Sequence, residues 1–221
     1  MKILAVILAR KNSKRLKLKN KKKLGKYPLF LWSVFSASKI KNIQDILVST
    51  DDKDIEKICK SKKICVLKRP KNLSKDNTSS ANSAIHAVSW YQKNFEKVGA
   101  VLLLQPTSPF RLKKTIIKAI NLFLKNNYKP VVSVSKLKHQ LYNLYEYSNK
   151  RLTKKTAKKE NKKLYAANGV IYIIKFSDLK KTKSFLTKNI IPLELSSPKE
   201  ILDIDDKNDF ELAKLLLGKK I

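Results

Sequence analysis

The sequence predicts an α/β fold in which a mainly parallel β-sheet packs against helices. Short, β-prone apolar runs alternate along the chain with longer segments whose apolar residues recur at helical spacing. The β-prone runs are largely apolar throughout, which is typical of strands buried on both faces. Strands of this kind, separated by helices, form βαβ units with right-handed crossovers. A chain of 221 residues, 43% of them hydrophobic, can bury one core, so we expect a single domain over residues 1–221.

Six apolar runs are predicted to be strands. The first is a continuous run that Arg10 ends, the fourth is also apolar throughout, and the last is rich in β-branched residues. In chain order, the predicted strands occupy residues 3–9, 46–49, 64–67, 100–105, 130–134 and 169–175. Helical periodicity is found over residues 29–40, 54–62, 81–94, 113–126 and 209–217. Gly218 follows the last of these segments, where it can end the helix.

One region breaks this alternation. Residues 141–147 alternate only weakly between apolar and polar, and they lead into a polar, lysine-rich tract without apolar periodicity. We expect a small excursion from the sheet at about residues 136–167. The lysine-rich tract within it is expected to be a loop and not a nucleic-acid-binding tail.

The charge balance points first to nucleic acid, because the formal net charge is +33. The 50 cationic side chains comprise 45 lysines and 5 arginines, and the lysines are scattered through every segment. A dedicated nucleic-acid surface concentrates its charge and favours arginine, whose planar fork contacts bases and phosphates in pairs. A solvated lysine surface that binds nucleic acid only non-specifically is therefore the favoured interpretation, and a basic nucleic-acid-binding protein is the alternative.

Other features bear on the compartment. The first apolar run is short for a signal peptide, and no stretch reaches the roughly 18–20 apolar residues that cross a bilayer. Cys59 and Cys65 fit two small buried hydrophobic residues better than a disulfide or metal pair. We expect a cytoplasmic protein without membrane contact.

The loops after the strands are where a parallel sheet binds its ligand. The loop after residues 3–9 is dense in hydrogen-bond donors, which suits a triphosphate. It has neither the G-x-G-x-x-G pattern of dinucleotide-binding proteins nor the GK[ST] sequence of a P-loop. Arg10, Arg15, Arg69 and Arg111 all follow apolar runs, where a guanidinium could grip phosphate or carboxylate.

A set of collinear motifs resembles the acylneuraminate cytidylyltransferase family. The matches cover almost the whole chain, and the Gln-Pro-Thr-Ser-Pro block at residues 105–109 is distinctive. Leu73, Asp76 and residues 209–210 add to the main matches, which are residues 8–15, 19–20, 48–52, 69–70, 79–80, 103–111, 132–134, 168–172 and 203–205.

The resemblance implies a Rossmann-like nucleotidyltransferase with helices on both faces of the sheet and a sugar pocket completed by a homodimer partner. The anomeric hydroxyl of a nine-carbon 2-keto-3-deoxy sugar acid would attack the α-phosphorus of CTP, and pyrophosphate would leave. Sialic, legionaminic and pseudaminic acids are the expected acceptors, and the shorter acid Kdo is the alternative. Positioning and charge neutralisation dominate such a transfer.

The resemblance also implies roles for individual residues. It gives catalytic roles to Arg10, Lys19 and Asp205. It places the nucleotide against Leu8, Ala9, Arg10, Ser13, Lys19, Asn20, Arg69, Ser79 and Ser80. The serine pair could instead cap the helix that follows it.

Mg²⁺ is the expected cofactor, with Asp203 and Asp205 as its ligands. An i, i+2 spacing in an extended segment puts both carboxylates on one side, and Mg²⁺ prefers few carboxylates plus phosphate oxygens. An acidic turn before the helix at Asp209 is the alternative. Asp51 and Asp52 precede a helical pattern, so they are better explained as capping residues.

The resemblance assigns the sugar to Gln105, Arg111, Asn168 and Tyr172. Arg111 could instead fix its own loop, and Tyr172 could be a core residue. The chain departs from the family near this site, because lysines replace an arginine-rich stretch before residues 165–167 and His139 is followed by Gln140 and not by proline. The identity of the acceptor therefore stays open.

Overall fold

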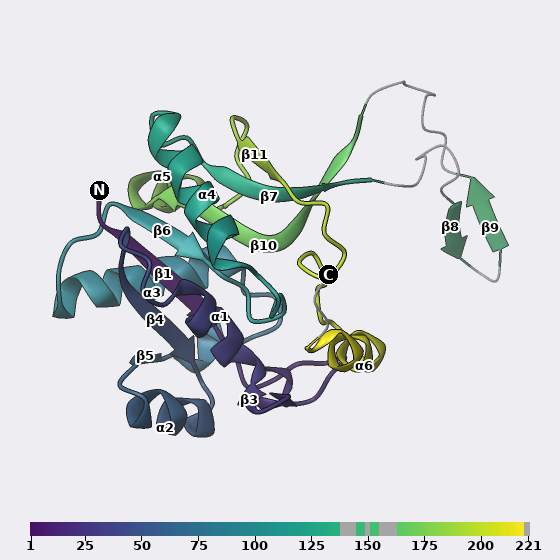
Figure 1. The fold of residues 1–221 in the computed structure, drawn as a ribbon, viewed down its shortest axis with the longest axis horizontal. Helices are drawn as coiled ribbons and strands as arrows, with labels where there is room; N and C mark the ends of the chain where they lie inside the picture. The colour runs from purple at the N-terminus through teal and green to yellow at the C-terminus, as the bar shows by residue number, and fades with distance from the viewer. Residues whose placement is uncertain (138–144, 149–150, 155–162, 219–221) are drawn as a thin grey trace.

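The fold is a seven-stranded sheet with helices on both faces, as predicted (Figure 1). The computed structural model describes residues 1–137, 145–148, 151–154 and 163–218. The sheet has the strand order β11-β7-β10-β6-β1-β4-β5. Its strands are β1 Ile3–Leu8, β4 Ile43–Thr50, β5 Cys65–Lys68, β6 Ala100–Leu103, β7 Val131–Lys136, β10 Tyr165–Lys175 and β11 Ile191–Glu194. The helices are α1 Leu29–Ala37, α2 Lys53–Ser61, α3 Ser80–Asn94, α4 Lys113–Lys125, α5 Phe176–Thr182 and α6 Lys207–Leu216.

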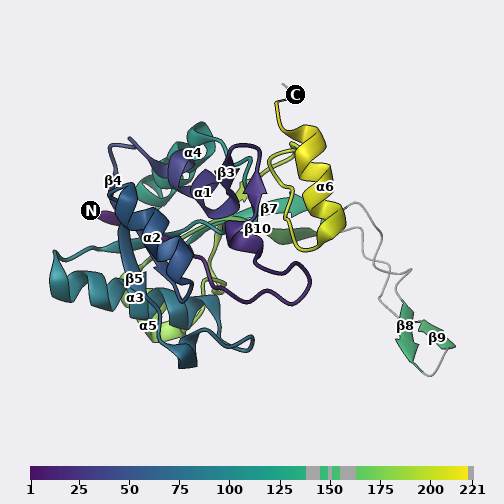
Figure 2. The same ribbon diagram turned by 90° about the horizontal axis from the view of Figure 1, so that it is seen from below.

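Strand β1 shows how the apolar runs build two cores at once. Ile3, Ala5 and Ile7 belong to the cluster under α1, α2 and α4, whereas Leu4 and Val6 belong to the cluster under α3 and α5. Figure 2 shows α1 and α4 on one side of the sheet and α3 and α5 on the other. Each buried side chain of this size contributes roughly 1.5–3 kcal/mol, so a strand apolar on both faces is anchored in the middle of the sheet.

The sheet is mainly parallel, with one exception. β1 runs parallel to both β4 and β6, β4 runs parallel to β5, and β7 runs parallel to β11. β10 runs antiparallel to both of its neighbours, β6 and β7. The prediction of a mainly parallel sheet is therefore confirmed, and β10 is the antiparallel strand within it.

Polar caps define three of the helix starts. Asp52 caps α2 by accepting a hydrogen bond from the Asp54 N–H, which confirms the predicted capping role of Asp52. Ser79 caps α3 through the Asn82 N–H. α6 begins two residues before its predicted start, because Asp206 and Asp209 form a reciprocal capping box there.

Several elements were not predicted. They are α5, the edge strand β11 and a two-stranded ribbon of β2 Lys23–Leu24 and β3 Tyr27–Pro28. The sheet also resumes at Tyr165, which pairs with Lys136, so the excursion ends before its predicted limit at residue 167. Within the excursion, β8 Tyr145–Ser148 pairs with β9 Arg151–Lys154 in an antiparallel ribbon drawn well away from the main sheet (Figure 1). Most of the predicted lysine-rich loop, residues 155–162, lies outside the described residues.

No helix in the described part of the chain is long and apolar enough to cross a membrane. Both Cys59 and Cys65 are free thiols; Cys59 is buried, as predicted, whereas Cys65 is only half-buried.

The two thiols are expected to react very slowly in the folded protein. Burial raises the pKa of Cys59 to about 12 and that of Cys65 to about 11. Since the thiolate is the nucleophile, little reactive thiol is present at pH 8, and its fraction rises only as the pH approaches these values. Ellman's reagent should label the native protein at least about a hundredfold more slowly than the protein unfolded in guanidinium. Rapid labelling of the native chain would contradict this burial.

Candidate active site

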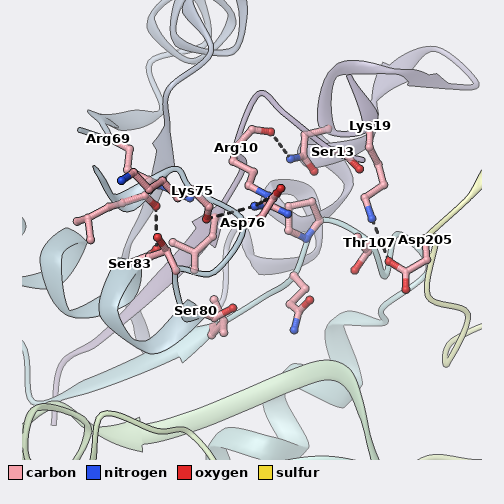
Figure 3. Close-up of a pocket in the computed structure, with 17 residues that line it drawn as sticks. Arg10, Ser13, Lys19, Arg69, Lys75, Asp76, Ser80, Ser83, Thr107 and Asp205 are labelled. Carbon is pink, nitrogen blue, oxygen red and sulfur yellow. Dashed lines mark hydrogen bonds and ion pairs between the residues drawn. The ribbon is translucent and has the colours of Figure 1, made fainter. Parts of the chain in front are cut away.

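A polar cleft lies at the carboxyl ends of the parallel strands, where the sequence places the ligand. Its walls come from the loop after β1, the loop after β5, the start of α3, the loop after β6 and the segment before α6 (Figure 3). We call it the first cleft. Nine of the predicted site residues line it: Leu8, Arg10, Ser13, Lys19, Asn20, Arg69, Ser80, Gln105 and Asp205.

The main chain at the start of the loop after β1, residues 9–19, is held by hydrogen bonds to three side chains. The Thr50 hydroxyl donates to the Ala9 carbonyl at 2.6 Å, and the Lys11 N–H donates to Asp51 at 2.7 Å. Asn20 donates its amide to the Arg10 carbonyl at 2.8 Å. Ala9 is buried and lies outside the cleft lining, and Asp51 supports this loop. The first three residues of the loop are therefore held in place before any ligand arrives.

Arg10 projects from this loop into the cleft, where it meets a carboxylate. Its Nη1 lies 2.8 Å from Asp76 Oδ1, and the Lys14 Nζ lies 3.0 Å from Asp76 Oδ2. The Arg10 side chain remains 34% exposed, so its guanidinium is accessible to a ligand.

Lys19 lies deeper, beside the acidic segment before α6. Its Nζ donates to the Ile204 carbonyl at 2.8 Å and to Asp205 Oδ1 at 3.1 Å (Figure 3). Arg15 Nη2 contacts the other oxygen of Asp205 at 2.6 Å. Asp205 thus bridges two cations of the loop after β1.

Arg69 lines the first cleft but also makes structural contacts, and the two serines of the predicted pair differ in their positions. Arg69 Nε and Nη2 donate to the Ser49 hydroxyl and carbonyl at 3.0 and 2.6 Å, which ties the loop after β5 to the end of β4. Burial lowers the pKa of the Arg69 guanidinium to about 10, so it stays charged at neutral pH. Ser79 caps α3 and lies outside the cleft lining, whereas Ser80 lines it.

A second cleft meets the first at Gln105, which lines both. Asn168, Gly169, Tyr172 and Asp203 line this second cleft. Burial raises the pKa of the Tyr172 phenol, and the charge of Asp203 acts in the same direction. The predicted sugar residues Gln105, Asn168 and Tyr172 are therefore brought together, next to the predicted nucleotide residues.

A wide bulge in β10 shapes this second cleft. Residues 168–171 face the single residue Ser133 of β7, whose hydroxyl donates to Asn168 Oδ1 at 2.6 Å and accepts from the Ile171 N–H at 2.8 Å. The Asn168 amide also donates to the Ser135 hydroxyl at 2.8 Å. Gly169 has a φ of +79°, a backbone conformation that residues with a Cβ rarely adopt. The amide of Asn168 is thus engaged in holding the bulge.

The predicted metal pair is split between the two clefts. Asp205 lines the first cleft and Asp203 the second, and the two clefts meet at Gln105. Burial raises the pKa of Asp203 and the charge of Asp205 acts in the same direction, whereas the Thr107 side chain lowers it. Thr107 interacts with this carboxylate, but Oδ1 of Asp203 is buried without a hydrogen bond of normal geometry among the described residues, and a bound cation would supply a partner. Those residues contain no cluster of three or more metal-ligating side chains, so ligand oxygens would have to complete a Mg²⁺ site.

Arg111 lies beneath the clefts and lines neither of them. It is almost fully buried, and Nε, Nη1 and Nη2 donate to the Val170 carbonyl, the Ser33 hydroxyl and the Gln105 carbonyl at 2.6, 3.1 and 2.8 Å. Burial lowers the pKa of this guanidinium. Of the two predicted roles, the geometry favours fixing the loop over binding a ligand.

Replacing Arg111 with methionine should therefore act on stability. The change removes three buried hydrogen bonds, although the Gln105 carbonyl keeps the Ser33 hydroxyl as a donor at 3.1 Å, and we expect the free energy of unfolding to fall by about 2–4 kcal/mol. Urea denaturation measures this directly. Arg151→Met, at an exposed position, is the control and should change stability by less than about 0.5 kcal/mol. Full stability of Arg111→Met combined with a raised KM for an acceptor would restore the ligand-binding role.

Several side chains at the site have no role predicted from the sequence, among them Asp76, Arg15 and Thr107. Asp76 and Thr107 fall within the motif matches, and Arg15 is an arginine of the loop after β1. Their contacts cross from one loop to another, and only the folded chain brings those loops together.

Comparison with known proteins matches the sequence of this chain to one family. Residues 4–220 match the family model described as cytidylyltransferase. The chain is 34% identical over 226 residues to an N-acylneuraminate cytidylyltransferase of Escherichia coli O18:K1:H7, covering 99% of this chain and 53% of that protein. It is also 34% identical over 236 residues to a CMP-N,N'-diacetyllegionaminic acid synthase of Legionella pneumophila subsp. pneumophila, covering 98% of this chain and 97% of that protein.

The chain thus spans about half the length of the Escherichia coli relative and nearly all of the Legionella one. Among solved structures, it resembles a CMP:2-keto-3-deoxy-manno-octonic acid synthetase complexed with CTP. That match has a TM-score of 0.74 and 14% identity and covers 100% of both chains, so it bears on the fold alone.

Proposed function

The chain belongs to the cytidylyltransferase family, and from that premise we propose that it transfers CMP from CTP to a nonulosonic acid and releases pyrophosphate. The observation that carries the proposal is the meeting of two clefts at Gln105, one lined by the cations of the loop after β1 and the other by the bulge of β10. A triphosphate in the first cleft and a sugar acid in the second would meet at this residue.

The chain's own residues would act mainly by binding and charge neutralisation. Arg10 lies just after β1 in a segment held by three hydrogen bonds, and Lys19 is held by the Ile204 carbonyl and Asp205, so both cationic groups are positioned before the triphosphate binds. Fixed cations that face the charge developing on the leaving pyrophosphate stabilise the transition state without reorganisation. Gln105, at the junction, is placed to orient the attacking hydroxyl toward the α-phosphorus.

We propose Asp203 and Asp205 as the residues that would hold Mg²⁺, which would neutralise phosphate charge when bound. The buried, unpartnered Oδ1 of Asp203 supports this assignment. Asp205 would also hold Lys19 toward the cleft, through the contact of 3.1 Å.

The nonulosonic acceptor is supported by the relatives of 34% identity, which are named for acylneuraminate and legionaminic acid chemistry. The Kdo alternative is supported only by a fold match at 14% identity. We further propose that the protein works as one domain, as a homodimer and in the cytoplasm. The compartment is supported by two free thiols in the described chain.

The test is pyrophosphate release with each of the four nucleoside triphosphates, with and without Mg²⁺, against sialic, legionaminic and pseudaminic acids and Kdo. We expect release with CTP, a nonulosonic acid and Mg²⁺ together. If pyrophosphate is released with Kdo and with none of the nonulosonic acids, Kdo is the acceptor. If no acid gives release, the proposal is overturned. Tight nucleic-acid binding that persists at high salt would favour the nucleic-acid alternative, because non-specific phosphate contacts weaken steeply with salt.

A further inference from the structure

Asp76 is a carboxylate placed among the cations of the proposed triphosphate site. It lies in the loop between the short helix Lys71–Leu73 and α3, across the first cleft from the loop after β1. Its two oxygens contact Arg10 Nη1 at 2.8 Å and Lys14 Nζ at 3.0 Å. Figure 3 shows the Asp76 and Arg10 side chains meeting in the cleft.

The chemistry of this contact resembles that of a phosphate. A carboxylate that bridges two cations offers each of them one anionic oxygen, as two phosphate oxygens would. The contact with Lys14, and secondarily the charge of Arg10, lowers the pKa of Asp76, so it is anionic at neutral pH. Only Asp76 and Asp205 are acidic among the described residues that line the first cleft. An anion at this position is notable in a chain with 50 cationic and 17 acidic residues.

Any phosphate that binds Arg10 and Lys14 must compete with Asp76. Both ion pairs are partly solvated, because Asp76 is 42% exposed, so each is weak enough to be displaced. A triphosphate contacts several cations at once, and these contacts can offset the loss of the ion pairs that Asp76 makes with Arg10 and Lys14. A single phosphate offers fewer contacts in return.

We propose that Asp76 is a specificity-determining residue: it occupies Arg10 and Lys14 until a polyphosphate displaces it. It thereby sets a threshold of affinity that single phosphates do not reach. Such a threshold matters in a protein of net charge +33, because an unopposed cationic cleft attracts every phosphate in solution. The inference rests on the proposed binding of CTP in the first cleft.

The test is the affinity of Asp76→Asn for CTP and for inorganic tripolyphosphate, measured by calorimetry without metal. Loss of the competing anion should lower both dissociation constants by about three- to tenfold, which corresponds to removing one or two exposed ion pairs. Cytidine, which has no phosphate, should bind wild type and variant alike. Unchanged or weaker binding of tripolyphosphate would overturn the proposal, and weaker binding would mean that Asp76 orients Arg10 for the ligand.

A matched control and a second background separate local competition from general charge. Asp178 on α5 forms an exposed ion pair with Lys175 at the end of β10. Asp178→Asn removes the same charge and should leave both dissociation constants within about twofold of wild type. In an Arg10→Ala background, the gain from Asp76→Asn should shrink, because the contested cation is gone. An undiminished gain there would show that Asp76 acts only through its general field, and the proposal of direct competition would be wrong.

The wild-type titration tells the two proposals apart. If wild type binds neither CTP nor tripolyphosphate, with or without Mg²⁺, the proposed function and this inference fall together. If it binds both and Asp76→Asn gains nothing, only the inference is wrong.

Discussion

Replacing Arg10 with alanine is expected to lower kcat/KM for CTP by about a hundredfold or more. Arg10 presents its guanidinium to the first cleft from a loop that Thr50, Asp51 and Asn20 hold in place. Loss of one preorganised charge-stabilising group costs about 2.7–4 kcal/mol in the transition state, which is a factor of about 10² to 10³. Initial rates of pyrophosphate release at varied CTP measure the effect.

The fold should survive this substitution, because the side-chain contacts of Arg10 are an exposed ion pair with Asp76 and a long hydrogen bond to the Lys75 carbonyl at 3.4 Å. Lys17→Ala, an exposed cation in the same loop, is the control and should retain kcat/KM within about twofold. Thermal unfolding of both variants should match wild type. Near-normal turnover of Arg10→Ala would remove Arg10 from the active site.

The sequence could predict the strands of the sheet because their signal is local. β1 is apolar at every position, and its residues divide between the two cores by simple alternation. α5 lacked such a signal, since Phe176 and Leu179 are its buried residues within seven positions. β11 carries Pro192, which is tolerated because this strand lies at the edge of the sheet.

The location of the site was also predictable, but the roles within it were only partly so. Arg10 and Arg111 both follow apolar strands, and the sequence alone treats them alike. They differ because Ser33 and Val170, which are distant in sequence, converge with the nearby Gln105 on Arg111. The split of Asp203 and Asp205 between two clefts likewise depends on packing, because the segment before α6 is not a regular strand. Spacing rules assume a regular backbone, so they could not predict which cleft each carboxylate lines.

Asp205→Asn should lower kcat by about a hundredfold or more at saturating CTP and Mg²⁺. The carboxylate bridges Lys19 and Arg15 and is one of the two proposed metal ligands, so the change removes a metal oxygen and loosens a cation together. Pyrophosphate release over a range of Mg²⁺ concentrations measures the loss. Glu211→Gln on the exposed face of α6 removes the same charge nearby and should stay within about twofold of wild type.

The substitution also separates the two roles of Asp205. If the carboxylate acts by holding the metal, high Mg²⁺ or Mn²⁺ should restore part of the lost rate, and direct titration with Mn²⁺ should show weaker binding. If it acts only by holding Lys19, metal binding should be unchanged, and Lys19→Met should lose as much activity as Asp205→Asn, with no further loss in the double variant. The side chain of Lys19 is only 12% exposed and keeps the Ile204 carbonyl as its other partner, so it would stay near its place without Asp205. For that reason we expect the metal-dependent outcome, and kcat within about twofold of wild type would exclude both roles.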